Sequence, residues 1–303
     1  MSDETNKTKG SEANLNGIYA AALTPMSRDG SEIAPGCIGP LMDYMDVKGL
    51  DGVLVLGTTG EFSSLTFDEK KVVIAEAGST RGNLKLIVGC SSTSLPETLE
   101  LVKLAEKKKA DAVIITPPFY FKAAPARGIE AYFETVLKSC DCKVLLYHIP
   151  ANTGIGLERQ MLERLSRYEN FWGIKDTGGK LQETSKYLGQ APGKVLLGSD
   201  QLLLSGLKIG IHGAITACAN IIPELVTKIY KGYRNGQDME SDQKSLTEFK
   251  KSLGTIPMHS ALKSITRLRG IDIGGVRLPL ATLGQNDEDF VHSLALRYNL
   301  VDI

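Results

Sequence analysis

The segments KVLLYHIPANTG at residues 143–154 and FWGIKDT at residues 171–177 decide the fold class of this sequence. Each begins with a short run of apolar residues that is typical of a buried strand, and residues 158–167 between them carry the apolar spacing of a helix. A strand, a helix and a second strand predict a parallel pair joined by a crossover. The same alternation continues in both directions along the chain.

From Gly17 to Asn235, short apolar runs alternate with amphipathic stretches. We expect strands at Ile18–Leu23, Gly52–Leu56, Lys85–Gly89, Ala112–Ile115, Lys143–Tyr147, Phe171–Lys175, Val195–Gly198 and Gly213–Thr216. We expect helices near Cys37–Lys48, Thr66–Gly78, Pro96–Lys108, Arg127–Cys140, Glu158–Arg167, Leu181–Leu188, Gln201–Leu207 and Pro223–Asn235. This order predicts a parallel sheet, either doubly wound or closed, and a repeat count of eight favours a (β/α)8 barrel.

The alternation divides the 303 residues into three expected segments. Residues 1–14 are polar, lack the apolar stretch of a secretory signal, and are expected to form a disordered arm. Residues 15–235 are expected to form the catalytic barrel, and residues 236–303 a C-terminal helical region in which Asp287–Tyr298 is the clearest helix. Capping boxes are expected at Thr66 with Glu69 and at Ser94 with Glu97.

The composition is that of an ordinary globular protein, with 42% hydrophobic residues. The 35 basic and 35 acidic side chains cancel, which leaves no electrostatic signature of a nucleic-acid or membrane-surface partner. No stretch reaches the ~18 apolar residues of a membrane span. The five scattered cysteines indicate a reduced, cytoplasmic chain, and the Cys140–Cys142 pair alone lacks the spacing of a zinc site.

In a barrel of this kind, catalytic side chains project from the C-terminal ends of the strands. Lys175 ends the sixth expected strand and Tyr147 ends the fifth, so the amine and the phenol should lie at the same depth. A desolvated amine can attack a carbonyl carbon, and a phenol can exchange protons there. Lys175 could instead pair with Asp176 or reach solvent. The turn at residues 57–61, GTTGE, could direct backbone N–H groups at a carboxylate or simply join a strand to a helix.

Four segments together resemble the dihydrodipicolinate synthase and N-acetylneuraminate lyase family. They are GTTGEFSSLT (57–66), TPPFYF (116–121), YHIPANTG (147–154) and GIKDT (173–177). Their order and spacing are similar to those of the family from Gly17 to the C-terminal helices. The resemblance implies a class I pyruvate-dependent aldolase or lyase, and we expect it to use no cofactor and no metal.

The resemblance also implies roles for individual residues. Lys175 matches the lysine that forms an imine with pyruvate, and Tyr147 matches the tyrosine that acts as general acid and base. Thr58 matches the hydroxyl that relays protons to this tyrosine, and with Thr59 it matches the cradle for the pyruvate carboxylate. Ile215 matches a residue whose backbone carbonyl faces the lysine.

One further match concerns subunit assembly. Tyr120 resembles a tyrosine that reaches into the site of a neighbouring subunit, although this match requires a one-residue insertion and Phe119 competes for the position. Members of the family are commonly homotetramers built as dimers of dimers.

The sequence departs from the lysine-biosynthetic synthases at Asn152, where they carry a carboxylate-binding arginine. An amide cannot supply the fixed charge of a guanidinium. The resemblance therefore favours reversible cleavage of a hydroxylated 2-keto acid, of the 2-keto-3-deoxy sugar acid or 4-hydroxy-2-oxoglutarate type, to pyruvate and an aldehyde. Asp200 and Gln201 match positions that hold substrate hydroxyls, or they simply open a helix. The alternative is 4-hydroxy-tetrahydrodipicolinate synthase, which condenses pyruvate with aspartate semialdehyde.

Other classes of protein have weaker support. The glycine run at residues 154–159 lacks the third glycine of a dinucleotide-binding turn. The four histidines have no partner at metal-binding spacing, and no glycine-rich phosphate cradle for pyridoxal phosphate follows the last two strands. A sensor that keeps the barrel but not the chemistry would have lost Lys175 or Tyr147, and both are present.

Overall fold

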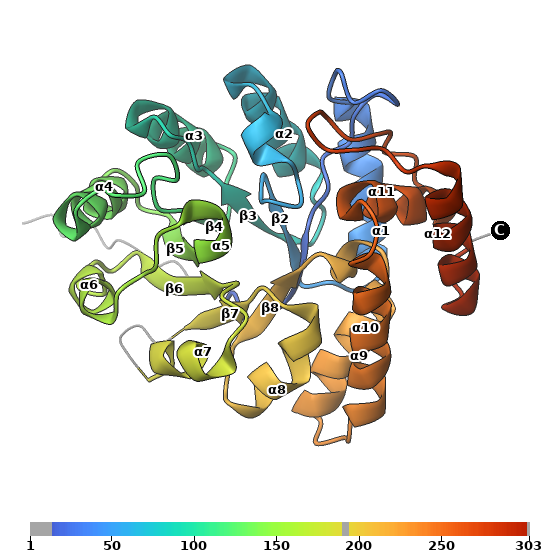
Figure 1. Ribbon diagram of the computed structural model, residues 1–303. Helices are drawn as coiled ribbons and strands as arrows, with labels where there is room; N and C mark the ends of the chain where they lie inside the picture. The colour runs from blue at the N-terminus through green and yellow to red at the C-terminus, as the bar shows by residue number, and fades with distance from the viewer. Residues whose placement is uncertain (1–13, 190–193, 302–303) are drawn as a thin grey trace, which may run out of the picture.

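The computed structural model describes residues 14–189 and 194–301, and within them eight parallel strands close into a barrel (Figure 1). Each strand pairs with its sequence neighbours, and β1 closes the barrel against β8. The strands are β1 (Gly17–Ala21), β2 (Gly52–Val55), β3 (Lys85–Gly89), β4 (Ala112–Ile115), β5 (Lys143–His148), β6 (Phe171–Asp176), β7 (Val195–Leu197) and β8 (Gly213–Thr216). The predicted (β/α)8 barrel is therefore confirmed.

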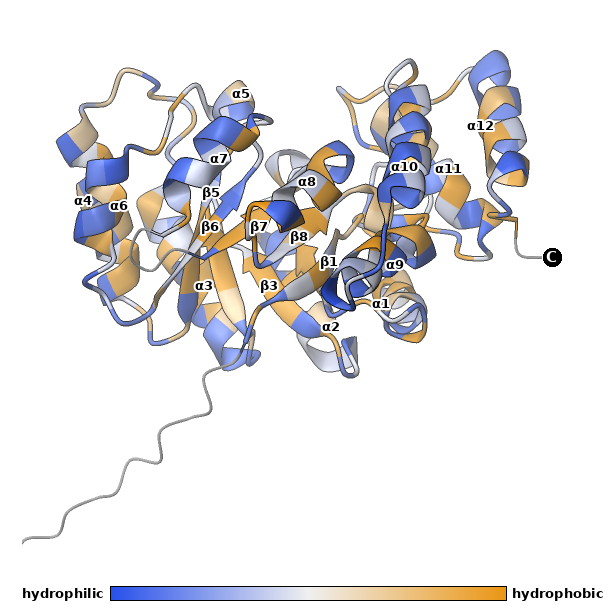
Figure 2. Cartoon of the chain, turned by 90° about the horizontal axis from the view of Figure 1, so that it is seen from below, coloured by the Kyte–Doolittle hydropathy of each residue, from blue (hydrophilic) through white to orange (hydrophobic). Residues whose placement is uncertain are grey.

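Helices surround this barrel and follow the strands in order (Figure 1). They are α1 (Ile38–Val47), α2 (Phe67–Thr80), α3 (Leu95–Lys107), α4 (Ala126–Lys138), α5 (Pro150–Thr153), α6 (Arg159–Leu165), α7 (Leu181–Tyr187), α8 (Leu203–Lys208) and α9 (Pro223–Arg234). The C-terminal extension adds α10 (Glu240–Leu253), α11 (Met258–Leu268) and α12 (Gln285–Arg297). In Figure 2, α10 and α12 rise toward the same end of the barrel as α5, the short helix that follows β5.

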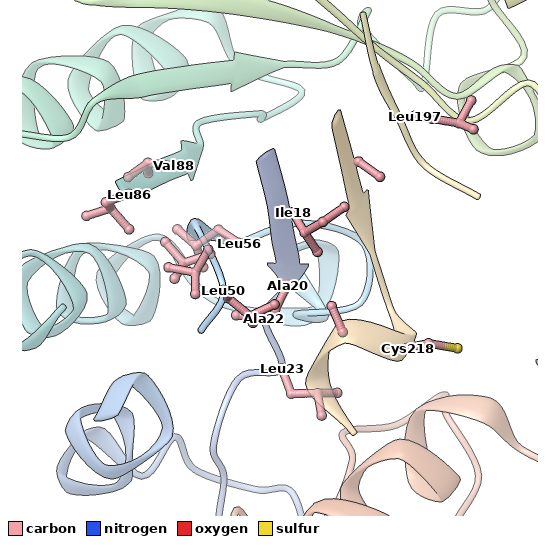
Figure 3. Close-up of a cluster of buried hydrophobic side chains, with 14 of the residues drawn as sticks. Ile18, Ala20, Ala22, Leu23, Leu50, Leu56, Leu86, Val88, Leu197 and Cys218 are labelled. Atoms are coloured by element: carbon pink, nitrogen blue, oxygen red, sulfur yellow. The ribbon is translucent and has the colours of Figure 1, made fainter. Parts of the chain in front are cut away.

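Strand residues alternate between two cores because successive side chains of a strand point to opposite faces. In and just after β1, Ile18, Ala20 and Ala22 belong to the core between the barrel and its helices (Figure 3). Tyr19 and Ala21 point to the barrel interior, where they join a second cluster. That interior cluster also contains Tyr147 and side chains from β2 to β8, so side chains fill the interior of the barrel.

The expected elements were placed to within a few residues, but two local features differ. The short helix α5 was not among the expected helices. The capping box at Thr66 is confirmed, whereas Ser94 makes no side-chain cap. Glu97 instead accepts a hydrogen bond from the Ser92 hydroxyl at 2.6 Å, and the N–H of Ser94 donates to Ser92 Oγ.

Apart from Asn14, the expected N-terminal arm at residues 1–14 lies outside the described residues. The division between a barrel at 15–235 and a helical region at 236–303 remains a prediction. α11 and α12 pack on each other, and α10 packs on α9 and on the 3-10 turn η3 (Asp200–Leu202) that follows β7.

Candidate active site

Lys175 and Tyr147 meet at the C-terminal end of the barrel, as their places in β6 and β5 predicted. The two residues are direct partners in the strand register. Lys175 Nζ donates a hydrogen bond to Tyr147 Oη at 3.1 Å and lies 4.2 Å from the centre of its ring. Both side chains are buried, with exposed fractions of 3% and 4%. The alternative in which the amine reaches solvent is excluded by this burial.

The surroundings of Tyr147 favour ionisation of its phenol. Burial raises the pKa of Tyr147, but the positive charge and hydrogen bond of Lys175 lower it. The nearby hydroxyls of Thr58 and Thr177 act in the same direction, and together these groups hold the pKa of Tyr147 below its usual value. A phenol in this state can both give and take a proton at a carbon bound to Lys175.

The turn after β2 presents free backbone donors beside this pair. Carbonyl oxygens of the turn accept internal hydrogen bonds, from the N–H of Gly60 to Gly57 and from the N–H of Glu61 to Thr58. In the part of the chain that the structure describes, neither the N–H of Thr58 nor that of Thr59 donates a hydrogen bond. Two adjacent N–H groups without partners form a concave binding place for an anion such as a carboxylate.

The shape of this turn depends on unusual backbone angles at both of its ends. Leu56 and Glu61 adopt left-handed conformations with φ of 56° and 58°, which costs non-glycine residues of the order of 1 kcal/mol each. Gly60 is required between them, because a Cβ there would lie 2.8 Å from the carbonyl oxygen of Ala22. Thr24 Oγ1 donates to the Gly60 carbonyl at 2.6 Å and holds the turn from the side of β1.

A cavity of about 160 Å³ opens next to Thr58. Phe62 and Phe119 form one wall, with their rings edge to face at 6.1 Å. Hydroxyl and amide groups and the side chain of Ile149 complete the lining, and none of its described residues carries a charge. The lining residues are Thr58, Phe62, Ser63, Thr116, Phe119, Ile149, Asn152 and Thr153.

The two site residues predicted after β7, Asp200 and Gln201, differ in burial. Asp200 is 3% exposed, and its Oδ2 accepts a hydrogen bond from the N–H of Cys218 at 3.4 Å. Among the described residues, Asp200 Oδ1 has no hydrogen-bond partner. Gln201 is exposed at the surface. Asp200 is therefore the better candidate of the pair for a substrate hydroxyl, because it keeps a buried acceptor unused.

Three other predicted residues have different positions. Ile215 lies in β8 and packs inside the barrel, and the contact of its carbonyl with Lys175 remains a prediction. Tyr120 is 77% exposed and stacks edge to face on Phe121, which is 70% exposed. Phe119, which competes with Tyr120 for the family position, lines the cavity of its own chain.

Sequence reasoning missed Thr177 and Phe62. Thr177 follows Lys175 by two residues, so the twofold repeat of a strand places both side chains on one face and could have identified it. A Cβ on Gly198 would lie 2.3 Å from Thr177 Oγ1, so only a glycine at position 198 leaves space for this hydroxyl. Phe62 gave no such indication, because an aromatic residue after a turn is usually a packing residue.

The Cys140–Cys142 pair lies at the other end of the barrel, before β5, and the structure adds Glu106 to it. The possible ligand atoms of these three residues lie within 4.8 Å of one another. Glu106 Oε1 already accepts the N–H groups of Asp141 and Cys142, at 2.7 and 3.0 Å. This loop-closing role explains why the carboxylate is there.

Comparison with known proteins places the chain in one family. A sequence profile of the dihydrodipicolinate synthetase family matches residues 14–296. The chain belongs to this family. An uncharacterized DapA-like lyase of Chloroflexus aurantiacus is 31% identical over 277 residues, which cover 89% of this chain and 93% of the relative. A 4-hydroxy-tetrahydrodipicolinate synthase of Listeria welshimeri is 30% identical over 89% of this chain and 94% of the relative.

Solved structures agree with this assignment. YagE, a prophage protein of the dihydrodipicolinic acid synthase family from E. coli K12, was solved in complex with pyruvate. It superposes with a TM-score of 0.89 at 27% identity and covers 95% of this chain and 100% of its own. Because members of the dihydrodipicolinate synthetase family are lyases and aldolases, the chain is an enzyme of the lyase class. Among the described helices, none is both long and apolar enough to span a membrane.

Proposed function

We propose that the protein is a Schiff-base-forming aldolase that cleaves a hydroxylated 2-keto acid, reversibly, to pyruvate and an aldehyde. The observation that carries this proposal is the contact of 3.1 Å between Lys175 Nζ and Tyr147 Oη, beside the N–H groups of Thr58 and Thr59, which donate no hydrogen bond to any described residue. The amine supplies the nucleophile, the phenol supplies the proton exchange, and the two N–H groups supply a place for the carboxylate of the keto acid.

The reaction proceeds through an imine on Lys175. The amine attacks C2 of the keto acid, Tyr147 protonates the departing hydroxyl, and water leaves as the iminium forms. Tyr147, which is then a phenolate, takes the proton from the C4 hydroxyl; the C3–C4 bond breaks, the aldehyde is released, and the electron pair of that bond moves into the iminium to give an enamine. Protonation of the enamine at C3 and hydrolysis of the imine return pyruvate and free Lys175.

Borohydride reduction tests this mechanism directly. Reduction in the presence of pyruvate should add a stable mass to the chain, and peptide mass spectrometry should locate it on Lys175. Lys175→Ala should lose the adduct and essentially all turnover, whereas Lys180→Ala, which changes an exposed lysine near the same end of the barrel, should keep both. An adduct on another lysine would refute the mechanism.

The cavity beside Thr58 supports a neutral aldehyde as the second product. Asn152 lines this cavity in place of the family arginine, and none of the other lining residues carries a charge. The hydroxyl and amide groups suit a hydroxylated aldehyde such as glyceraldehyde better than a carboxylate-bearing one. This argument favours the sugar-acid type of substrate over 4-hydroxy-2-oxoglutarate and over the synthase reaction.

The synthase alternative keeps the support of relatives that are 30% identical and carry that name. The two functions are separated by kcat/KM for glyceraldehyde, glyoxylate and aspartate semialdehyde at saturating pyruvate. We expect glyceraldehyde to be the best of the three. We also expect Asn152→Arg to raise kcat/KM for aspartate semialdehyde by about tenfold or more, since a charge-assisted contact is worth about 1.5–3 kcal/mol. A large preference of the unmodified protein for aspartate semialdehyde would establish the synthase.

A further inference from the structure

A buried ion pair lies directly behind the turn that carries Thr58 and Thr59. Glu61 Oε1 and Lys263 Nζ are 2.9 Å apart, and their side chains are 0% and 2% exposed. The other carboxylate oxygen of Glu61 accepts the N–H of Arg277 at 2.9 Å. Lys263 also donates to the carbonyl of Gly275. The side chains of both residues therefore have their partners in the C-terminal region, Lys263 and Arg277 for Glu61 and Gly275 for Lys263, although Glu61 Oε1 has the ion pair alone.

Such a pair needs an explanation beyond stability. Transfer of two charges from water to the protein interior is costly, and the attraction between the two ions often fails to exceed this cost. An apolar pair of similar volume could fill the same space. Glu61 is also one of the two residues that adopt a left-handed backbone at the ends of the turn. A conformation of this kind persists only where its surroundings enforce it, and Lys263 and Arg277 are those surroundings.

Lys263 lies on α11, and this helix contacts the turn through a second residue. His259 precedes Lys263 by four residues on α11, so the two side chains lie on one face of the helix. His259 Nε2 lies 3.3 Å from the carbonyl oxygen of Thr58. Because a carbonyl can only accept, the ring nitrogen is the donor. α11 therefore contacts the carbonyl at the start of the turn and the carboxylate at its end.

We propose that Lys263 and His259 are positioning residues, through which α11 aims the N–H groups of Thr58 and Thr59 at the carboxylate of pyruvate. This inference rests on the proposed function. A carbonyl that is held on one side of a peptide bond fixes the direction of the next N–H, because the peptide unit is planar. His259 thereby sets the N–H of Thr59, and the ion pair prevents Glu61 from relaxing and rotating the turn.

The role predicts a specific loss of carboxylate recognition. The carboxylate is bound in the ground state and in the transition state alike. If the N–H groups of the turn point in another direction, KM for pyruvate should therefore rise while kcat stays nearly unchanged. Ketones without a carboxylate, such as acetone, do not use the turn. Their imines should therefore form on Lys175 at the same rate in the unmodified protein and in variants that change the direction of these N–H groups.

The experiment compares borohydride trapping of pyruvate with trapping of acetone in four variants. His259→Leu removes the donor and His259→Gln replaces it with an amide N–H. Lys263→Met removes one charge, and the double variant Glu61→Gln with Lys263→Met removes both. The control is Arg267→Met on the same helix, whose partner Glu288 lies 3.4 Å away and which is 39% exposed. Thermal unfolding of each variant shows whether it is folded.

We expect the half-saturating pyruvate concentration to rise about tenfold or more in His259→Leu and in the double variant, with acetone trapping unchanged. His259→Gln should restore much of the loss, and Arg267→Met should resemble the unmodified protein. If Lys263→Met does not fold because Glu61 is left as an unpaired buried charge, the double variant and His259→Leu decide the question.

Two failures are distinguishable. If the unmodified protein traps no pyruvate on Lys175, the proposed function is wrong. If it traps pyruvate but the folded variants keep its preference for pyruvate over acetone, only the positioning role is overturned. A parallel loss of pyruvate and acetone trapping would also overturn it, because that result would indicate general damage to the barrel.

Discussion

At the scale of single residues, the chemistry depends on the hydroxyl group of Tyr147. Tyr147→Phe removes this oxygen and leaves the buried ring in place, so the fold and the thermal stability should hardly change. We expect kcat to fall by a factor on the order of 10²–10⁴, the usual contribution of a general acid and base. Steady-state kinetics and thermal unfolding of the variant check this prediction. A kcat close to that of the unmodified protein would reduce Tyr147 to a packing residue.

The pH at which Tyr147 ionises should depend on Lys175. The positive charge of Lys175 favours the phenolate and lowers the pKa of Tyr147, whereas burial raises it. Lys175→Met removes the charge and the hydrogen bond but not the burial, so the pKa of Tyr147 should move upward. Phenolate absorbance during alkaline titration measures this shift when the curve of a Tyr147→Phe protein is subtracted in each background. A downward shift in Lys175→Met would contradict the electrostatic explanation.

At the scale of elements, the two expected capping boxes provide a matched comparison. The hydroxyl of Thr66 accepts the N–H of Glu69, and Glu69 accepts the N–H of Thr66 in return. Thr66→Ala should therefore lower the free energy of unfolding by about 1 kcal/mol. Ser94→Ala removes no cap and should lower the free energy of unfolding by less than about 0.5 kcal/mol. Urea unfolding of both variants measures the difference, and equal losses would refute the assignment of the caps.

The elements also show which features a sequence can predict. Strand ends were predictable because apolar runs stop where the chain leaves the barrel, and these ends placed Lys175 beside Tyr147. The cap at Ser94 was predicted wrongly because the Ser92 hydroxyl competes successfully for Glu97. The contacts of Lys263 with Glu61 and of His259 with Thr58 join residues about 200 positions apart, and no local pattern indicates a pairing of that range.

At the scale of the whole molecule, the exposed aromatic pair after β4 bears on assembly. Tyr120 and Phe121 are both more than two-thirds exposed, which is typical of residues that are covered by another subunit. In accordance with the family resemblance, we propose a homotetramer, a dimer of dimers, in which Tyr120 reaches the site of a neighbouring chain.

Hybrid oligomers test this arrangement. Tyr120→Phe should lower turnover, and Lys175→Ala should abolish it, when each variant is assembled alone. If Tyr120 acts in the neighbouring site, mixing the two should restore a site that has both Lys175 and a partner's intact tyrosine. Activity of the mixture should then exceed the sum of the separate activities. A purely additive mixture, or a monomer in sedimentation experiments, would refute the exchange of tyrosines.

The ion pair between Glu61 and Lys263 also constrains how the protein is made. When Asn235 has just been added to the growing chain, all eight strands, Lys175 and the whole turn at residues 57–61 have been synthesised, but neither His259 nor Lys263 has. Until α11 emerges, the Glu61 carboxylate must stay hydrated, because a buried charge without its partner is strongly unfavourable. We therefore expect the nascent barrel to stay open around this turn until the partners of Glu61, Lys263 and Arg277, have emerged. On this expectation, Lys175 acquires a complete carboxylate-binding turn only after most of the chain has been synthesised.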